Sequence, residues 1–505
     1  MTAERTVPRA DEQLAPNRLG IAGIVFFVVA AAAPLVGMTG AVPVAIVLGN
    51  GAAAPGAYLV AGLVLLVFSV GYSAMSHRVA NTGAFFAFVG RGLGLVPGVA
   101  TAFVSLLAYL AVQLAIYGFF GSVAHEQLEA HLSIDLPWWV WTLLAWAIVL
   151  TLSLLQVDIG AKLLGVLMTL EVLSLLLVAV VVLFQGGGPD GLGFSASFSP
   201  SNIFAGGFGG SAGIALAFAF ASYIGFEATA IYAEETRDPK RAVPRATYTA
   251  VAMIALLFAL TSWAVVSGVG SAHAVDKVAE LSSVQGTPLA DPAAVLFSVA
   301  EQYVGGWLST LLSWLVLSSL FAGLLAFQNS ASRYFFSMGR AGVLPRALDR
   351  VNRRGAPVFG SVSTSVISVV VVAIFALAGK DPVLTLFYWF SGLAVLAIVL
   401  VEILVSVAVI VHFRREPGSV GVLTSVVAPV VAIVGLALGA YLIMARFGLL
   451  AGTSANADDS LKSFALSATG WVLVLAPFVV LALGFVLGAV RRNSENERAI
   501  ADLVS

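Results

Sequence analysis

Two stretches of this sequence place helix-breaking residues beside groups that can hold charge. Residues 33–43 contain two prolines and two glycines around Thr39, and residues 221–227 contain Gly225 close to Glu227. Both stretches lie inside apolar blocks, and irregular backbone at membrane depth persists only where it lines a cavity or is buried in protein. Half-helices that meet there offer bare amides at one end and bare carbonyls at the other. The pattern predicts a site for a small zwitterion.

The two charged ends of such a solute would bind different breaks. We expect its carboxylate on the amides of the first stretch, with the Thr39 hydroxyl, and the residues concerned are Val36, Gly37, Met38, Thr39 and Gly40. We expect its ammonium on carbonyls of the second stretch, which are those of Ala221, Ser222, Tyr223 and Ile224.

Three carboxylates lie inside apolar blocks: Glu171, Glu227 and Glu402. An ionised carboxylate at mid-bilayer costs a few kcal/mol, so each is a functional candidate. Glu227 adjoins a predicted break, and we expect it to act in proton coupling or gating. For Glu402, in an unbroken apolar run, we expect a structural role as a protonated group hydrogen-bonded to a neighbouring helix. For Glu171 both interpretations stay open.

Other polar and aromatic residues complete the candidate site. Ser318 and Ser319 would form a cation or hydrogen-bond site, although paired serines also serve as small packing residues. Gln113 shares one helix face with Tyr109 and Tyr117 and is predicted to line the pocket. The aromatic cluster at 387–390 is predicted to be an interfacial belt rather than a binding site.

Composition sets the class of protein. The 505 residues are 60% hydrophobic and 10% charged, which is far from a soluble domain. Lys and Arg number 25 against 26 Asp and Glu, so no basic excess is present for nucleic acid. The chain has no Cys, and its histidines fall in loops or at block ends. These are His77, His125, His131, His273 and His412. We therefore expect no metal site and no catalytic set. We expect a membrane protein that is not an enzyme and needs no cofactor or metal.

Twelve apolar blocks have the length of membrane-crossing helices. Alternating the loops between two sides places 21 of the 25 Lys and Arg on one side. This positive-inside pattern puts both termini in the cytoplasm of a multi-pass protein of the plasma or inner membrane. The predicted organisation is an N-terminal tail (1–18), five spans (19–184), five more (209–412), two final spans (422–490) and a C-terminal tail (491–505). Because the interrupted blocks open each set of five, the pattern is typical of an inverted-repeat transporter with its substrate at the midplane.

The long segment at 270–305, on the side with few cations, has its own helical pattern. Helix-like stretches occur at 273–281 and 292–303. We expect the segment to lie across the outer mouth as a lid.

Several motifs resemble those of the amino acid/polyamine/organocation permease family. The sixth block has Gly225-Phe226-Glu227, followed by Glu234-Glu235 and by Asp-Pro-Lys-Arg-Ala-Val-Pro-Arg at 238–245. The segments at 81–85 and 329–340 also resemble the family's sequences. The resemblance implies an all-α polytopic protein of twelve transmembrane helices, with a LeuT-like five-plus-five inverted repeat followed by two C-terminal helices.

The family resemblance also implies roles for individual residues. The substrate carboxylate would bind at Gly37–Gly40, the amine at Ala221 and Ile224, and Glu227 would act in gating or proton response. This sequence departs from the family where relatives have Gly-Ser-Gly and here Gly-Met-Thr-Gly stands at 37–40. It has Glu171 where proton-coupled relatives carry a Lys, and Ala221 where some relatives have a gating Trp, which favours a roomier pocket.

We therefore predict a secondary active transporter of amino acids that works by alternating access, with proton-coupled uptake. A carrier of polyamines or other organic amines, an exchanger, and sodium in place of the proton remain open alternatives. A channel or a structural bundle is the alternative outside the class of transporters.

Overall fold

The computed structural model describes residues 20–78, 85–155, 158–207, 210–231, 236–456 and 462–490. The predicted tails at 1–18 and 491–505, the motif residues 81–84 and the pair Glu234–Glu235 lie outside this range. The described residues are helical and form no β-strand beyond isolated bridges. Within these ranges, ten helices are long and apolar enough to cross a membrane. The chain is therefore an all-helical multi-pass membrane protein.

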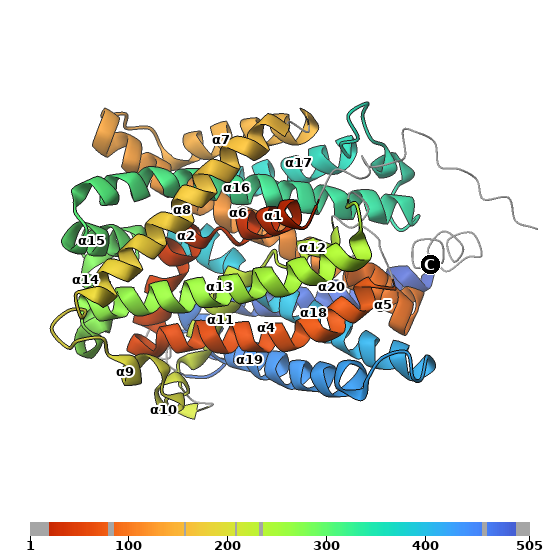
Figure 1. Ribbon diagram of the computed structural model, residues 1–505. Helices are drawn as coiled ribbons and strands as arrows, with labels where there is room; N and C mark the ends of the chain where they lie inside the picture. The colour runs from red at the N-terminus through yellow and green to blue at the C-terminus, as the bar shows by residue number, and fades with distance from the viewer. Residues whose placement is uncertain are drawn as a thin grey trace, which may run out of the picture.

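The helices run roughly antiparallel in one bundle (Figure 1). In the first half their bounds are α1 Ile21–Ala32, α2 Pro34–Val36, α3 Val42–Val44, α4 Ala54–Ser76, α5 Phe85–Leu93, α6 Leu95–Leu132, α7 Trp138–Leu155, α8 Asp158–Phe184, α9 Phe194–Phe198 and α10 Pro200–Ile203. In the second half they are α11 Ala212–Tyr223, α12 Ala228–Ile231, α13 Pro239–Val269, α14 Ala274–Leu281, α15 Ala293–Tyr303, α16 Gly306–Arg340, α17 Val358–Leu377, α18 Tyr388–Arg415, α19 Ala428–Leu450 and α20 Ala468–Val490.

The first interrupted block is broken, as predicted, but nearer to its start. α1 ends at Ala32, the next residue Ala33 has a left-handed φ of 41°, and α2 begins at Pro34. Proline lacks an N–H and disfavours helical geometry in the residue before it, so the hydrogen-bond ladder stops there. Residues 34–50 then continue through α2, π-helical Gly37–Ala41 (η2), α3 and π-helical Ala45–Asn50 (η3).

The second interrupted block breaks where its Gly predicts. α11 is only 12 residues long and ends at Tyr223. Ile224 is extended, and Gly225 has a φ of +114°, a left-handed conformation that glycine adopts without a Cβ penalty. The chain resumes a helix at α12.

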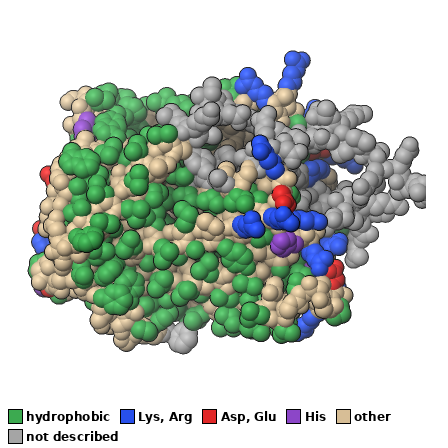
Figure 2. Space-filling view, viewed as in Figure 1, with side chains coloured by type: hydrophobic (Ala, Val, Ile, Leu, Met, Phe, Trp, Pro, Cys, Tyr) green, Lys and Arg blue, Asp and Glu red, His purple; other side chains and the backbone are tan. Residues whose placement is uncertain are grey.

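The surface of the bundle separates apolar flanks from charged ends. Figure 2 shows hydrophobic side chains over most of one face and Lys and Arg gathered at the end where α4 finishes and α13 begins. We call this the cation-rich end. α6 has 38 residues, or roughly 57 Å at 1.5 Å per residue, so it projects beyond a 30 Å hydrocarbon core.

The long segment on the opposite end contains the helices that the sequence predicted. They are α14 (Ala274–Leu281) and α15 (Ala293–Tyr303). α15 packs against η2 and α14 packs against η3. Both therefore cover the second half of the first broken block.

Close helix approaches depend on glycines without side chains. A Cβ at Gly213 of α11 would run into the backbone carbonyl of Leu442 in α19. Because a backbone atom cannot rotate away, α11 would have to shift. Small-to-large changes of this kind cost about 1–3 kcal/mol.

We expect Gly213→Ala to lower the unfolding temperature of the purified protein in detergent, because α11 is pushed away from α19. The matched control is Gly306→Ala, since a Cβ there meets no atom within 4 Å. Equal unfolding temperatures for the two variants would contradict the close approach of α11 and α19.

Candidate functional site

The two helix breaks lie against each other. A Cβ at Gly225 would be 2.6 Å from the Cβ of Ala31, in the last turn of α1. A Cβ at Gly37 would be 3.2 Å from the hydroxyl oxygen of Ser222 in α11, and it would also meet the Phe258 ring. The two glycines thus allow both interrupted segments to approach each other closely.

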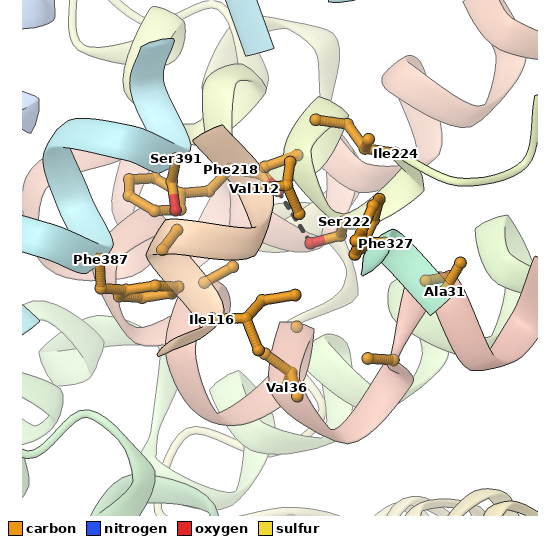
Figure 3. Close-up of a pocket in the computed structure, with 16 residues that line it drawn as sticks. Ala31, Val36, Val112, Ile116, Phe218, Ser222, Ile224, Phe327, Phe387 and Ser391 are labelled. Carbon is orange, nitrogen blue, oxygen red and sulfur yellow. Dashed lines mark hydrogen bonds between the residues drawn. The ribbon is translucent and has the colours of Figure 1, made fainter. Parts of the chain in front are cut away.

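A cavity of about 60 Å³ opens between the two breaks (Figure 3). In Figure 3 the Phe218 and Phe387 rings lie on one side, Phe327 and Ala31 on the other. Its lining residues are buried, except for Val112 and Ala221, which are partly exposed. Among the described residues no ionisable side chain lines the cavity, and the lining consists of Ala31, Ala32, Ala33, Val36, Gly37, Ala41, Val112, Ala115, Ile116, Phe218, Ala221, Ser222, Ile224, Phe327, Phe387 and Ser391.

Backbone groups supply the polarity that the side chains lack. The amide of Val36, at the start of α2, has no hydrogen-bond partner among the described residues. At the end of α11 the carbonyls of Ala221 and Tyr223 accept from Ile224 and Phe226. The carbonyl of Ser222 accepts no such bond within the described ranges. An unpaired donor and an unpaired acceptor therefore belong to residues that line the same cavity.

Glu171 fastens the first break to two other helices. Its Oε1 accepts the Leu35 amide at 2.6 Å and the Ser319 hydroxyl at 2.9 Å, and its side chain is buried. The amide is one of those that a new helix leaves unsatisfied in its first turn. The carboxylate thus ties α2 to α8 and α16. A separate cavity of about 10 Å³ lies beside it, and its lining includes Pro34, Ser318 and Ser319.

Glu227 plays the same part at the second break. Its Oε2 accepts the Gly225 amide at 2.9 Å, and its Oε1 accepts the Tyr109 hydroxyl of α6 at 3.0 Å. The Tyr72 hydroxyl of α4 donates to its backbone carbonyl at 2.7 Å. Each break therefore has one buried glutamate that accepts a backbone amide and a hydroxyl from another helix.

Several predicted site residues lie away from the cavity. Met38, Thr39 and Gly40 do not line it, because the break falls at Ala33 and these residues are already helical. The Thr39 hydroxyl donates to the Leu35 carbonyl one turn earlier, so it takes part in the helix rather than in the site.

Tyr223 and Gln113 also point elsewhere. The Tyr223 hydroxyl donates to the Tyr58 carbonyl, and the Gln113 amide donates to Gln328 at 2.7 Å. Gln113 therefore joins α6 to α16 and does not line the cavity. Ser318 donates to the Leu315 carbonyl in its own helix, whereas Ser319 binds Glu171.

One further expectation was wrong. Phe387 lines the cavity and stacks on Phe119 at 4.7 Å, and Tyr388 is buried, so these two residues form no interfacial belt. The side chain of Glu402 is buried, as expected for a structural role, and its expected bond to a neighbouring helix stays a prediction.

Sequence reasoning missed most of the apolar lining. Phe218, Phe327, Phe387 and Ile116 come from four helices and have no local signal that separates them from core residues. The spacing of Phe387 and Ser391 was a usable pattern, since residues four apart share a helix face. Phe387 ends the π-helical segment Pro382–Phe387 that continues into α18.

The fold and this site define a multi-pass membrane protein with an occluded cavity at paired helix breaks. Comparison with known families agrees, because the profile of the amino acid permease family matches residues 23–489. The chain belongs to this family of transporters.

The relatives of known name are distant in sequence, and each is named as an amino acid permease or transporter. The branched-chain amino acid permease BcaP of Lactococcus lactis subsp. cremoris is 26% identical over 64% of this chain and 68% of its own length. The probable threonine/serine transporter YbxG of Bacillus subtilis is 22% identical over 61% of this chain and 63% of its own length. The aromatic amino acid transport protein AroP of Escherichia coli is 23% identical over 77% of this chain and 82% of its own length.

The hydrogen bonds of Glu171 give a stability prediction. Glu171→Leu leaves the Leu35 amide and the Ser319 hydroxyl without an acceptor, and each unsatisfied buried donor costs about 1–3 kcal/mol. We expect a clear drop in unfolding temperature, measured in detergent. Glu171→Gln, which keeps an oxygen acceptor, should lose much less.

Leu173→Ala serves as the control, since that side chain lies two residues along α8 and is 56% exposed at the apolar surface. The assignment fails if Glu171→Leu unfolds at the same temperature as this control.

Proposed function

We propose that this protein is a secondary active transporter that takes up neutral amino acids with apolar side chains by alternating access. The observation that carries the proposal is the cavity at the two breaks, which offers a backbone donor, a backbone acceptor and apolar walls. The substrate carboxylate would bind at α2, on the Val36 amide, where Gly37 has no side chain to keep it away. Its ammonium would bind the Ser222 carbonyl at the end of α11.

The lining favours an apolar amino acid over a polyamine. A polyamine has no carboxylate and requires acidic partners, whereas the described residues that line this cavity include no ionisable side chain. Phe218, Phe327 and Ile116 provide apolar contacts for a substrate side chain. The printed names of two relatives, a branched-chain and an aromatic amino acid transporter, support the same class.

We further propose that the chain crosses the membrane twelve times in a five-plus-five inverted repeat with two additional helices. The ten long helices, together with the broken segments of α1–η3 and α11–α12, support that number. The excess of Lys and Arg on one side supports cytoplasmic termini in the cell membrane.

Glu171 is our candidate for proton coupling. As a carboxylate it forms charge-assisted hydrogen bonds with Leu35 and Ser319, which are roughly twice as strong as neutral ones. Protonation weakens the connection of α2 to α8 and α16. A proton can therefore change how firmly the first break, and the substrate amides beside it, are held. Glu227 would act in gating, since it ties the second break to α6 through Tyr109.

Substrate class is tested in proteoliposomes. We expect saturable uptake and counterflow of leucine or phenylalanine, with no competition from putrescine. Transport of putrescine alone would favour the amine carrier, and unsaturable flux would favour a channel. Uptake that requires internal amino acid under every gradient would identify an exchanger.

Filling the cavity tests its role. Ile116→Trp should weaken leucine binding by at least about tenfold, or 1.4 kcal/mol, because the larger ring occupies the substrate space. Binding can be measured by the leucine-dependent rise in unfolding temperature. Val434→Trp, which places the same ring at a 63% exposed surface position, should bind leucine normally. Unchanged binding in Ile116→Trp would exclude this cavity as the substrate site.

Coupling is tested with Glu171→Gln. We expect an inward proton gradient to drive leucine accumulation in the wild type and not in this variant, while leucine counterflow persists in both. Accumulation that follows a sodium gradient, or that survives the substitution, would contradict Glu171 as the proton site.

A further inference from the structure

A second, larger cavity lies far from the substrate site, at the cation-rich end. Its volume is about 470 Å³, and its lining is Val70, Ser73, Ala74, His77, Arg78, Lys240, Pro244, Tyr248, Ser419, Val420 and Thr424. These residues come from the end of α4, the start of α13 and the segment that leads into α19. α4 packs against both α13 and α19, and Figure 1 shows it running between them. α4 is thus the floor of the cavity, and the other two elements are its walls.

The cavity is basic. Three basic side chains line it, and the described lining residues include no acidic side chain. Arg78 forms an ion pair with Glu416 at 3.6 Å, so part of its charge is already compensated. Lys240 is exposed and has no hydrogen bond or ion pair with any described residue. Figure 2 shows Lys and Arg gathered with a His at this end of the molecule. The region attracts an anion, and none of the described residues that line the cavity provides one.

Hydroxyl groups accompany the cations. The cavity is lined by four of them, from Ser73, Tyr248, Ser419 and Thr424. Ser73 is only 4% exposed and lies beside Tyr248, yet its hydroxyl oxygen has no partner within hydrogen-bonding geometry among the described residues. An unsatisfied buried polar group is costly unless something binds it. Hydroxyls beside basic groups suit a phosphate, which offers several strong acceptor oxygens.

The surroundings of the cavity are apolar and face outward. Val422 and Leu423, next to the lining residue Thr424, are 70% and 67% exposed. Farther along, toward and within α19, Val427, Val431 and Val434 are 45%, 52% and 63% exposed. They follow Thr424 by three, seven and ten residues, so they share its helix face. Val434 is roughly 15 Å from Thr424 along the helix, which is half the depth of a 30 Å hydrocarbon core. A charged pocket thus continues into an apolar surface that runs along the membrane.

We propose that this cavity binds the phosphate headgroup of an anionic phospholipid, with its acyl chains along the start of α19. The phosphate binds Lys240, His77 and the Ser73 hydroxyl. A volume of about 470 Å³ accommodates a headgroup, since one water occupies about 30 Å³ in the liquid. Basic pockets between transmembrane helices are suited to anionic headgroups. The adjoining exposed apolar surface selects a lipid over a free anion.

The purified full-length protein in a neutral detergent tests this assignment. Its unfolding temperature is followed while phosphatidylglycerol, phosphatidylcholine, glycerol phosphate or inorganic phosphate is added. We expect phosphatidylglycerol to raise the unfolding temperature in a saturable manner and the other three to have little effect. Lys240→Ala should require about fivefold more phosphatidylglycerol, since one such charge is worth about 1 kcal/mol.

Arg241→Ala is the matched control. Arg241 is the next residue of the same helix, is 78% exposed and does not line the cavity. It should keep the wild-type response. Equal effects of phosphatidylcholine and phosphatidylglycerol, or equal losses in the two variants, would overturn the proposal. A response to inorganic phosphate as strong as that to the lipid would show a free-anion site and overturn the lipid assignment. The site is independent of transport, so none of these outcomes bears on the proposed function.

Discussion

The structure depends on how two interrupted helices keep their backbone groups satisfied within an apolar bundle. An unpaired amide in hydrocarbon costs several kcal/mol, so a helix break must be compensated by the protein around it. Here each break has its own buried glutamate. Glu171 accepts the Leu35 amide and Glu227 accepts the Gly225 amide, and each also accepts a hydroxyl from another helix. The two carboxylates therefore accept backbone amides that the carbonyls of a continuous helix would otherwise accept.

The same arrangement leaves part of the backbone for a ligand. The glutamates satisfy one amide at each break and leave Val36 and Ser222 with a free donor and a free acceptor at the cavity. The glycines at 37 and 225 let these segments approach without side chains between them. Much of the polarity at the cavity thus comes from the backbone, whereas its walls are mostly apolar. In the proposed function these walls would select the substrate side chain. This separation suits a family whose relatives are named for branched-chain and for aromatic amino acids.

The sequence predicted the parts of the site that follow from local chemistry. Gly225 and Glu227 could be placed at a break because a positive φ favours glycine and a buried acid requires a partner. The first break was expected at Gly37–Gly40 but lies at Ala33, since the proline that follows controls the geometry and an alanine with positive φ has no sequence signal. Gln113 and Phe387 were misplaced because their partners, Gln328 and Phe119, are far away in the chain. The periodicity of the sequence does not predict contacts between residues so far apart in the chain.

The central claim is that substrate occupies the space between the two breaks. The chain has no Cys, so single cysteines can be introduced without background. A cysteine replacing Ala221, which is half-buried at the cavity, can be labelled with a small methanethiosulfonate reagent in the presence and absence of leucine. Leucine should slow this reaction strongly and leave the labelling of a cysteine at the 53% exposed Leu63 unchanged. Equal labelling rates at position 221 with and without a transported amino acid would contradict the account.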